Sequence, residues 1–296
     1  MEQTYAILTD SAADLSADLV ERLNLVVLPL SVTLEGKEYL NYPDERDITA
    51  KYLYERLRAG AMATTAALNV DTFEREMETY LKAGKDVLYL SFSSGLSATY
   101  NASCIAAEEL REKYPERQLV VIDSLCASMG EGLLVHHALQ NRAAGMSLED
   151  NAAWVRDNVQ HLAHWFTVDD LMYLSRGGRL SGAKAMLGTA LGLKPLLKGD
   201  PNGRIVLCGK ARGRAQAIGK LADQYNALVR YPGDQTVCIA HGNAPQEAEA
   251  LAQRLRQTNP PKEILIAPFD PANGCHAGPG ALALFFEGDE TVRLHP

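Results

Sequence analysis

The sequence predicts an α/β fold with two α/β domains, the first built on an open, doubly wound parallel sheet. The first observation is a set of short apolar runs without polar alternation, which is typical of strands buried on both faces of a parallel sheet. The second is that stretches of helical periodicity alternate with these runs along the chain. The third is size, because 296 residues, of which 47% are hydrophobic, can bury more than one core.

The first half of the chain carries four of these apolar runs, each rich in leucine or β-branched residues. We expect strands at residues 5–8, 25–29, 87–92 and 119–122. Between and after them, apolar or small residues recur at three- and four-residue spacing, which indicates helices that cover the sheet. The expected helices span residues 16–23, 49–58, 70–83, 97–113, 126–143 and 147–161.

The second half begins with a strand-like run at residues 164–168, a short helix, and a segment rich in glycine and arginine at 176–184. We therefore place a boundary near residue 160, which gives domains at 1–160 and 161–296. The alternation of strands and helices continues, so the second domain is also expected to be α/β. Its strands are predicted at 204–208, 236–241, 263–267 and 281–286, and its helices at 211–230 and 245–257.

The composition disfavours several classes of function. With 29 Lys and Arg against 37 Asp and Glu, the net charge of −8 offers no general attraction for nucleic acid or anionic lipid. No apolar run approaches about 18 residues and the first ten residues lack a signal-peptide pattern, so we expect no transmembrane segment and no secretion. The cysteines are odd in number, scattered and never paired as CxxC, which favours a cytoplasmic location. They are Cys104, Cys126, Cys208, Cys238 and Cys275.

Motifs for nucleotide binding, hydrolysis and metal binding are incomplete in this chain. Residues 278–283 have the spacing of the dinucleotide fingerprint but precede a strand-like run rather than a helix, and no GxxxxGK[ST] loop occurs. Residues 95–97 begin like a nucleophile elbow, yet Thr99 stands where the closing glycine belongs. The sequence therefore predicts neither a cofactor nor a metal. The histidines that lack a carboxylate or cysteine partner at a recognised metal-binding spacing are His136, His137, His161 and His164.

Small hydroxyl residues cluster where three predicted strands end, at residues 9–11, 91–97 and 123–124. Ligands of an open parallel sheet bind at this edge. Ser93 and Ser94 are expected where the next helix begins, so that their hydroxyls and free backbone N–H groups can donate to a carboxylate or phosphate. The alternative is that these residues only cap helices and form turns.

A single histidine, His276, lies among glycines and a proline at residues 274–280, which predicts a loop. An imidazole in such a loop can donate to a carboxylate, and its charge near neutral pH depends on its neighbours. The alternative is a solvated or structural histidine.

A local basic cluster in this acidic chain begins with Arg176 and Arg179 and continues with Lys194, Lys210 and Arg212. Such a cluster can contact a phosphate or an acidic partner. For Lys194 and Lys210, solvated side chains beside turns are an equally good interpretation.

Six segments in a fixed order resemble the DegV family of fatty-acid-binding proteins, over essentially the whole chain. They are TDSAADL at 9–15, SFSSGLSATY at 91–100, VIDS at 121–124, LMYLSRGGRLSGAKAMLGTALGLKPLL at 171–197, KARGRAQA at 210–217 and GCHAGPGALAL at 274–284.

The resemblance implies two α/β domains with a fatty acid buried between them and its carboxylate held by hydroxyls and a histidine. The matching positions are Thr65, Ser93, Ser94 and His276. Residues 65–69 read TAALN where the family commonly has TSQPS, and Cys275 stands where such proteins often have threonine, so ligand preference can differ.

The resemblance further implies a carrier without catalytic activity of its own. It would bind a long-chain fatty acid as its only ligand and present the carboxylate to a separate fatty acid kinase, which forms an acyl phosphate. Arg176 and Arg179 would contact that partner or the new phosphate. Two other functions stay open: a lipid- or metabolite-sensing regulator, and a serine acyl hydrolase that uses Ser94 or Ser97 with His276.

Overall fold

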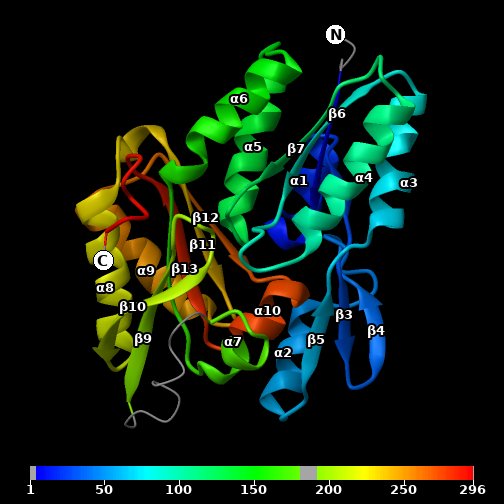
Figure 1. Ribbon diagram of the computed structural model, residues 1–296. Coiled ribbons are helices and arrows are strands. Elements are labelled where there is room, and N and C mark those ends of the chain that lie inside the picture. Colours follow the sequence, from blue (N-terminus) through cyan, green and yellow to red (C-terminus); the bar gives the residue numbers. More distant parts are fainter. Residues whose placement is uncertain (1–4, 181–191, 296) are drawn as a thin grey trace.

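The computed structural model describes residues 5–180 and 192–295, and within them it contains two large sheets and one small sheet (Figure 1). The first large sheet has four strands in the order β2-β1-β6-β7, and all of its pairs are parallel. This confirms the α/β class and the parallel sheet predicted for the first half. Its strands are β1 (Tyr5–Asp10), β2 (Val26–Leu28), β6 (Asp86–Ser91) and β7 (Leu119–Asp123).

Helices cover both faces of the first sheet, as the alternation along β1 shows. Ala6 and Leu8 belong to a core shared with α3 and α4, whereas Tyr5 and Ile7 belong to a core shared with α5 and α6. Successive side chains of a strand point to opposite faces, so this sheet is doubly wound. The helices of this half are α1 (Ala17–Arg22), α2 (Ala50–Arg58), α3 (Val70–Lys82), α4 (Thr99–Lys113), α5 (Met129–Ala143) and α6 (Leu148–Asn158), with a 3₁₀ turn η1 (Ser11–Ala13).

A small antiparallel sheet, which we did not predict, lies at the edge of the first half. It consists of β4 (Lys37–Leu40), β3 (Ser31–Leu34) and β5 (Ala63–Ala66), in that order. The β3–β4 hairpin turns at Glu35 and Gly36, whose φ angles of 53° and 81° are those that a tight hairpin requires. The strands are too short for their periodicity to be recognised in the sequence.

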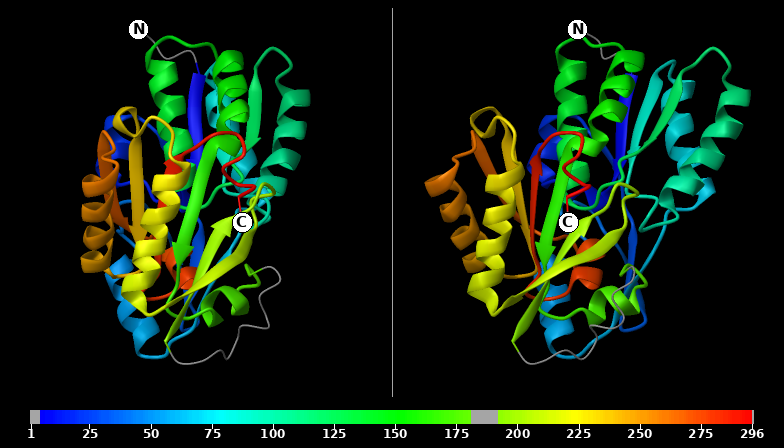
Figure 2. Two further views of the ribbon diagram at one scale, coloured as in Figure 1. Left: turned by 90° about the vertical axis from the view of Figure 1, so that its left-hand side faces the viewer. Right: turned by 60° about the vertical axis from the view of Figure 1, so that its left-hand side comes forward.

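The second large sheet is mixed and has six strands, in the order β10-β9-β8-β13-β11-β12. Only β11 and β12 pair in parallel; the other pairs are antiparallel. Helices α8 and α9 lie side by side on one face (Figure 2). The elements are η2 (Val159–His161), β8 (Leu162–Thr167), α7 (Met172–Arg176), β9 (Leu193–Gly199), β10 (Ile205–Arg212), α8 (Arg214–Leu228), η4 (Pro232–Asp234), β11 (Thr236–His241), α9 (Pro245–Thr258), β12 (Glu263–Pro268), α10 (Pro271–Ala277) and β13 (Leu282–Glu287).

One boundary and one strand in the second half differ from the prediction. The helix expected from residue 211 begins at Arg214, because 211 and 212 complete the pairing of β10 with β9. Strand β9 itself was not expected. The predicted division at residue 160 stays a prediction, and one apolar core crosses it, since Leu88 and Leu134 share a cluster with Leu197 and Phe285.

Helix α10 connects the two halves of the molecule. It follows β12 of the second sheet, yet it packs against α2 and β5 of the first half as well as against α7 (Figure 1). None of the helices in the part of the chain that the structure describes is long and apolar enough to cross a membrane.

Candidate functional site

A cavity lies between the ends of the first sheet and the inner face of the second. The space inside it, including the part that is open to solvent, is about 960 Å³. The wall is mostly apolar and comes from both halves of the chain. Its large apolar side chains include Phe92, Leu96, Phe166, Ile205, Phe269 and Phe285.

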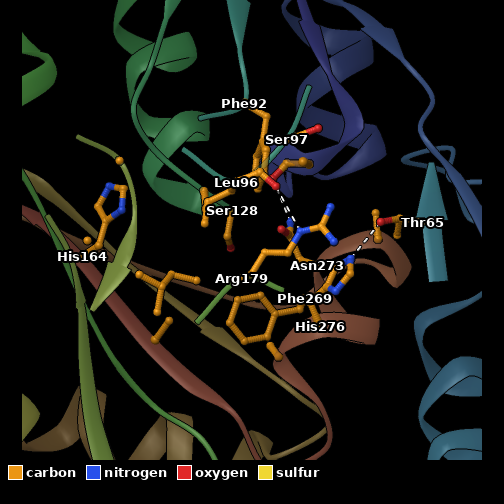
Figure 3. Close-up of a pocket in the computed structure, with 18 of the residues that line it drawn as sticks. Thr65, Phe92, Leu96, Ser97, Ser128, His164, Arg179, Phe269, Asn273 and His276 are labelled. Carbon is orange, nitrogen blue, oxygen red and sulfur yellow. Dashed lines mark hydrogen bonds between the residues drawn. The ribbon is translucent and has the colours of Figure 1, made fainter. Parts of the chain in front are cut away.

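At one end of the cavity, Thr65 and His276 are joined by a hydrogen bond. Thr65 Oγ1 lies 2.8 Å from His276 Nε2 (Figure 3). Thr65 comes from β5 and His276 from the last turn of α10, so two segments 211 residues apart form this pair.

The prediction of a loop around His276 is wrong, because His276 belongs to helix α10. Asp270 caps this helix by accepting from Asn273 N, and Pro271 occupies its first position, where a missing N–H costs nothing. The helix ends at Gly278, whose φ of 78° suits glycine. The Asp-Pro start and the glycine stop were present in the sequence, but the glycines inside and after the helix concealed them.

The imidazole of His276 is neutral near pH 7. Burial, and secondarily the charge of Arg179, lower its pKa from 6.5 to about 4. Its Nδ1 faces the backbone of Gly177 so closely that a Cβ there would overlap it. A neutral ring in this position offers its Nε2 edge, together with Thr65, to a polar group in the cavity.

Arg179 brings a positive charge to the same end of the cavity. Its Nε donates to Leu96 O at 3.0 Å and its Nη1 donates to Gly177 O, and the side chain lines the cavity (Figure 3). Among the described residues it forms no ion pair with a carboxylate. Arg176, by contrast, is exposed and lies with its guanidinium 5.7 Å from the ring centroid of Tyr173.

The structure separates Ser93 and Ser94 from Thr65 and His276. Ser93 is fully buried, and its Oγ donates to Gly203 O at 2.8 Å; Ser94 is exposed, and its N–H donates to Asp123 Oδ1 at 3.1 Å. Neither is among the residues that line the cavity.

The prediction that Ser93 and Ser94 lie where the next helix begins is wrong. Helix α4 begins at Thr99, because Ser97 Oγ accepts from Thr99 N at 3.2 Å and holds the preceding residues in a turn. Ser97 does line the cavity.

A network of buried polar groups fixes α10 to the first half, and sequence reasoning missed it. Asp270 N donates to Asp14 Oδ1 at 2.9 Å, Asn41 donates to the Asp270 carboxylate, and Asn273 Nδ2 donates to Ala12 O at 2.8 Å. Burial raises the pKa of Asp14 to about 6, and burial together with Asp14 raises the pKa of Asp270 well above its ordinary value. The only sequence signals of this network were the conspicuous Asp14 of the first motif and the Asp-Pro step at 270.

Of the remaining predicted basic residues, Lys194 Nζ donates to Asp169 Oδ1 at 2.6 Å, outside the cavity wall. Lys210 and Arg212 are exposed.

The part of the long family-like segment at 181–191 lies outside the described residues. Within the described residues, no group of three or more His, Cys, Asp or Glu side chains could hold a metal ion.

The fold and the cavity together define an α/β protein with a mostly apolar pocket between two sheets and a polar group of threonine, histidine and arginine at one end. The chain belongs to the DegV family, whose model, described as "Uncharacterised protein, DegV family", matches residues 4–289. A DegV domain-containing protein of Clostridium perfringens is 40% identical over 285 residues, which cover 96% of this chain and 98% of the relative. One from Streptococcus pyogenes is 34% identical and is covered to 99% of its length.

Solved structures with this fold contain fatty acids. A DegV family protein of Thermus thermophilus, described as binding fatty acid, superposes with a TM-score of 0.88 at 30% identity and covers 97% of this chain and 100% of its own. A DegV family protein of Ruminococcus gnavus with vaccenic acid gives a TM-score of 0.87 at 26% identity, covering 96% of this chain and all of its own. Both of these related proteins are thus lipid-binding proteins.

Proposed function

We propose that this protein binds a long-chain fatty acid in the cavity, with the carboxylate at Thr65, His276 and Arg179. The observation that carries the proposal is the position of these three polar side chains at one end of a mostly apolar wall. Arg179 supplies the charge that a buried carboxylate needs, and Thr65 and the neutral His276 supply hydrogen bonds. The fatty acids bound by related proteins support the same conclusion.

The apolar wall accounts for most of the affinity. Burying one methylene contributes about 0.8 kcal/mol, so about fifteen of them contribute roughly 12 kcal/mol before the costs of association. The polar end contributes orientation, since a carboxylate placed along the apolar part of the wall would lack donors.

Ser93 and Ser94 remain predicted carboxylate ligands, but their geometry gives them a different first role. The Ser93 hydroxyl holds Gly203, at the turn between β9 and β10, against the first half and so shapes the wall. To reach a carboxylate, the hydroxyl of Ser93 would have to leave Gly203 O, and that of Ser94 would require a different loop conformation.

We extend the proposal to a carrier role in which a separate fatty acid kinase transfers the γ-phosphoryl group of ATP to a carboxylate oxygen, giving an acyl phosphate and ADP. The exposed Arg176 lies on α7, whose residue Leu174 lines the cavity, and can meet an acidic kinase surface or the new phosphate, while Arg179 faces the headgroup inside. Arg176→Glu and Arg179→Glu, assayed for turnover with added kinase, test this role, and unchanged turnover in both would refute it. The cytoplasmic location, predicted from the cysteines, belongs to this role and stays a prediction; all five cysteines are free.

The geometry gives no support to a hydrolase. His276 contacts Thr65 through Nε2 and Gly177 through Nδ1, so within the described residues it bonds to neither a serine nor an orienting carboxylate. The regulatory alternative would need a macromolecular partner, which affinity capture can identify.

The direct test of fatty acid binding is mass spectrometry of the purified protein under native and then denaturing conditions, with extraction of any ligand. We expect a long-chain fatty acid at one per chain, and its loss or reduction in His276→Ala. A protein that is empty and also takes up no added fatty acid would overturn the proposal.

A further inference from the structure

A second histidine of the cavity wall, His164, lies at the side opposite His276 (Figure 3). His164 comes from β8 and is 6% exposed. Within the described residues neither ring nitrogen forms a hydrogen bond, and Nε2 is buried. A buried polar atom without a partner costs free energy, and such atoms are uncommon in folded proteins.

Two glycines make room for this imidazole. A Cβ on Gly130 of α5 would lie 2.5 Å from Nε2, and one on Gly199 of β9 would lie 3.1 Å from Nδ1. Phe285 packs edge-to-face on the ring with a centroid separation of 5.3 Å. Because Nε2 is closed off by Gly130, the ring edge that carries Nδ1 lies on the side of Gly199, and both His164 and Gly199 line the cavity.

The surroundings keep this ring neutral and create a positive electrostatic potential around it. Burial, and secondarily the charge of Arg293, lower the pKa of His164 well below its ordinary value. Arg293 is 2% exposed and donates to Leu162 O, Leu125 O and Cys126 Sγ. Arg293 forms no ion pair with a carboxylate in the described part of the chain, so an electron-rich oxygen is favoured near this ring.

We propose that His164 is a specificity-determining residue that hydrogen-bonds a hydroxyl group on the distal part of the acyl chain, so that the preferred ligand is a hydroxylated long-chain fatty acid. This inference rests on the proposed function. A hydroxyl both donates and accepts, so it pairs with either tautomer of the neutral imidazole. Because Nε2 is closed off, the hydroxyl would meet Nδ1, and a fully saturated chain leaves Nδ1 without a partner.

Competition binding against a fluorescent fatty acid tests this preference, with stearic acid and a series of hydroxystearic acids that differ in hydroxyl position. In the wild type, at least one isomer should bind about 3- to 10-fold more tightly than stearic acid, the range for one net hydrogen bond. His164→Leu should remove or reverse this ratio, and His164→Gln should retain part of it. Phe166→Leu is the matched control, since it changes an apolar part of the same wall and should alter both affinities alike.

The outcomes separate this inference from the proposed function. If all the acids bind but no hydroxylated isomer is preferred, or if His164→Leu leaves the ratio unchanged, the role of His164 is refuted and the fatty acid site stands. If none of the acids binds to the wild type, the proposed function fails. Should the leucine variant not fold, ¹⁵N spectra of the wild-type His164 ring decide: a hydroxylated acid should shift the ring nitrogens and stearic acid should not, and equal shifts would count against the proposal.

Discussion

Replacing Thr65 by valine removes the hydroxyl that lies 2.8 Å from His276 Nε2 and keeps nearly the same volume. A hydrogen bond to a charged group contributes about 1.5 to 3 kcal/mol, so we expect Thr65→Val to weaken fatty acid binding by about 10- to 150-fold. In the ligand-free protein the hydroxyl already pairs with His276, so the carboxylate replaces this contact, and the lower end of the range is the expected result. The measurement is the dissociation constant by isothermal titration calorimetry.

Two controls make this prediction specific. Thr64 precedes Thr65 on β5 and its side chain is exposed on the opposite face, so Thr64→Val should leave the affinity unchanged. The methyl ester of the same fatty acid carries no charge. Thr65→Val should therefore reduce the binding free energy of the ester only by the contribution of a neutral hydrogen bond, about 0.5 to 1.5 kcal/mol. Equal losses for acid and ester would mean that valine acts through packing, and no loss for the acid would remove Thr65 from the site.

The remaining predictions concern the other residues of the site. Arg179→Met should weaken acid binding more than ester binding and should raise the pKa of His276 above about 4, both visible by titration, because the Arg179 charge lowers that pKa; an unchanged His276 titration would contradict this. Ser93→Ala should lower the free energy of unfolding by about 1 to 3 kcal/mol in urea, since it leaves Gly203 O without its donor, whereas Ser94→Ala should stay within about 0.5 kcal/mol; equal effects would be inconsistent with their burial. The pKa of His276 is below its unfolded value, so the unfolded chain binds more protons between pH 6.5 and about 4, and stability falls as the pH is lowered through this window. Relative to His276→Asn, the wild type should lose up to about 3 kcal/mol between pH 7.5 and 4, and a constant difference between the two would refute the assignment.

Apolar runs and periodicity predicted the parallel sheet of the first half and its helices, since these strands are buried on both faces and the helices have apolar stripes. Residues 5–8 and 87–92 were recognised because every position carries an apolar or small side chain, a pattern that needs no knowledge of partners. Strands β3, β4 and β9 were missed because they are short or contain lysine and proline, and only pairing with a neighbouring strand makes them extended.

The site was predicted only in part for the same reason. Thr65 and His276 were selected by resemblance to a family, and the structure brings them together, although the bond between them depends on the packing of α10 on β5. Arg179 was selected for a phosphate or partner contact, and its direction into the cavity follows from its bonds to Leu96 and Gly177. Ser93 could not be distinguished from a cavity residue in the sequence, since its bond to Gly203 joins loops 110 residues apart.

The apolar core that contains both Leu88 and Phe285 has a consequence for how the molecule comes apart. A chain cut near residue 160 would give two fragments that each expose the face which the other covers, so neither should be a stable unit by itself. Loss of structure is then a single cooperative event, and the pocket exists only in the fully assembled chain. A ligand that occupies it stabilises the whole molecule by mass action, so the melting temperature of the protein reports whether the pocket is filled.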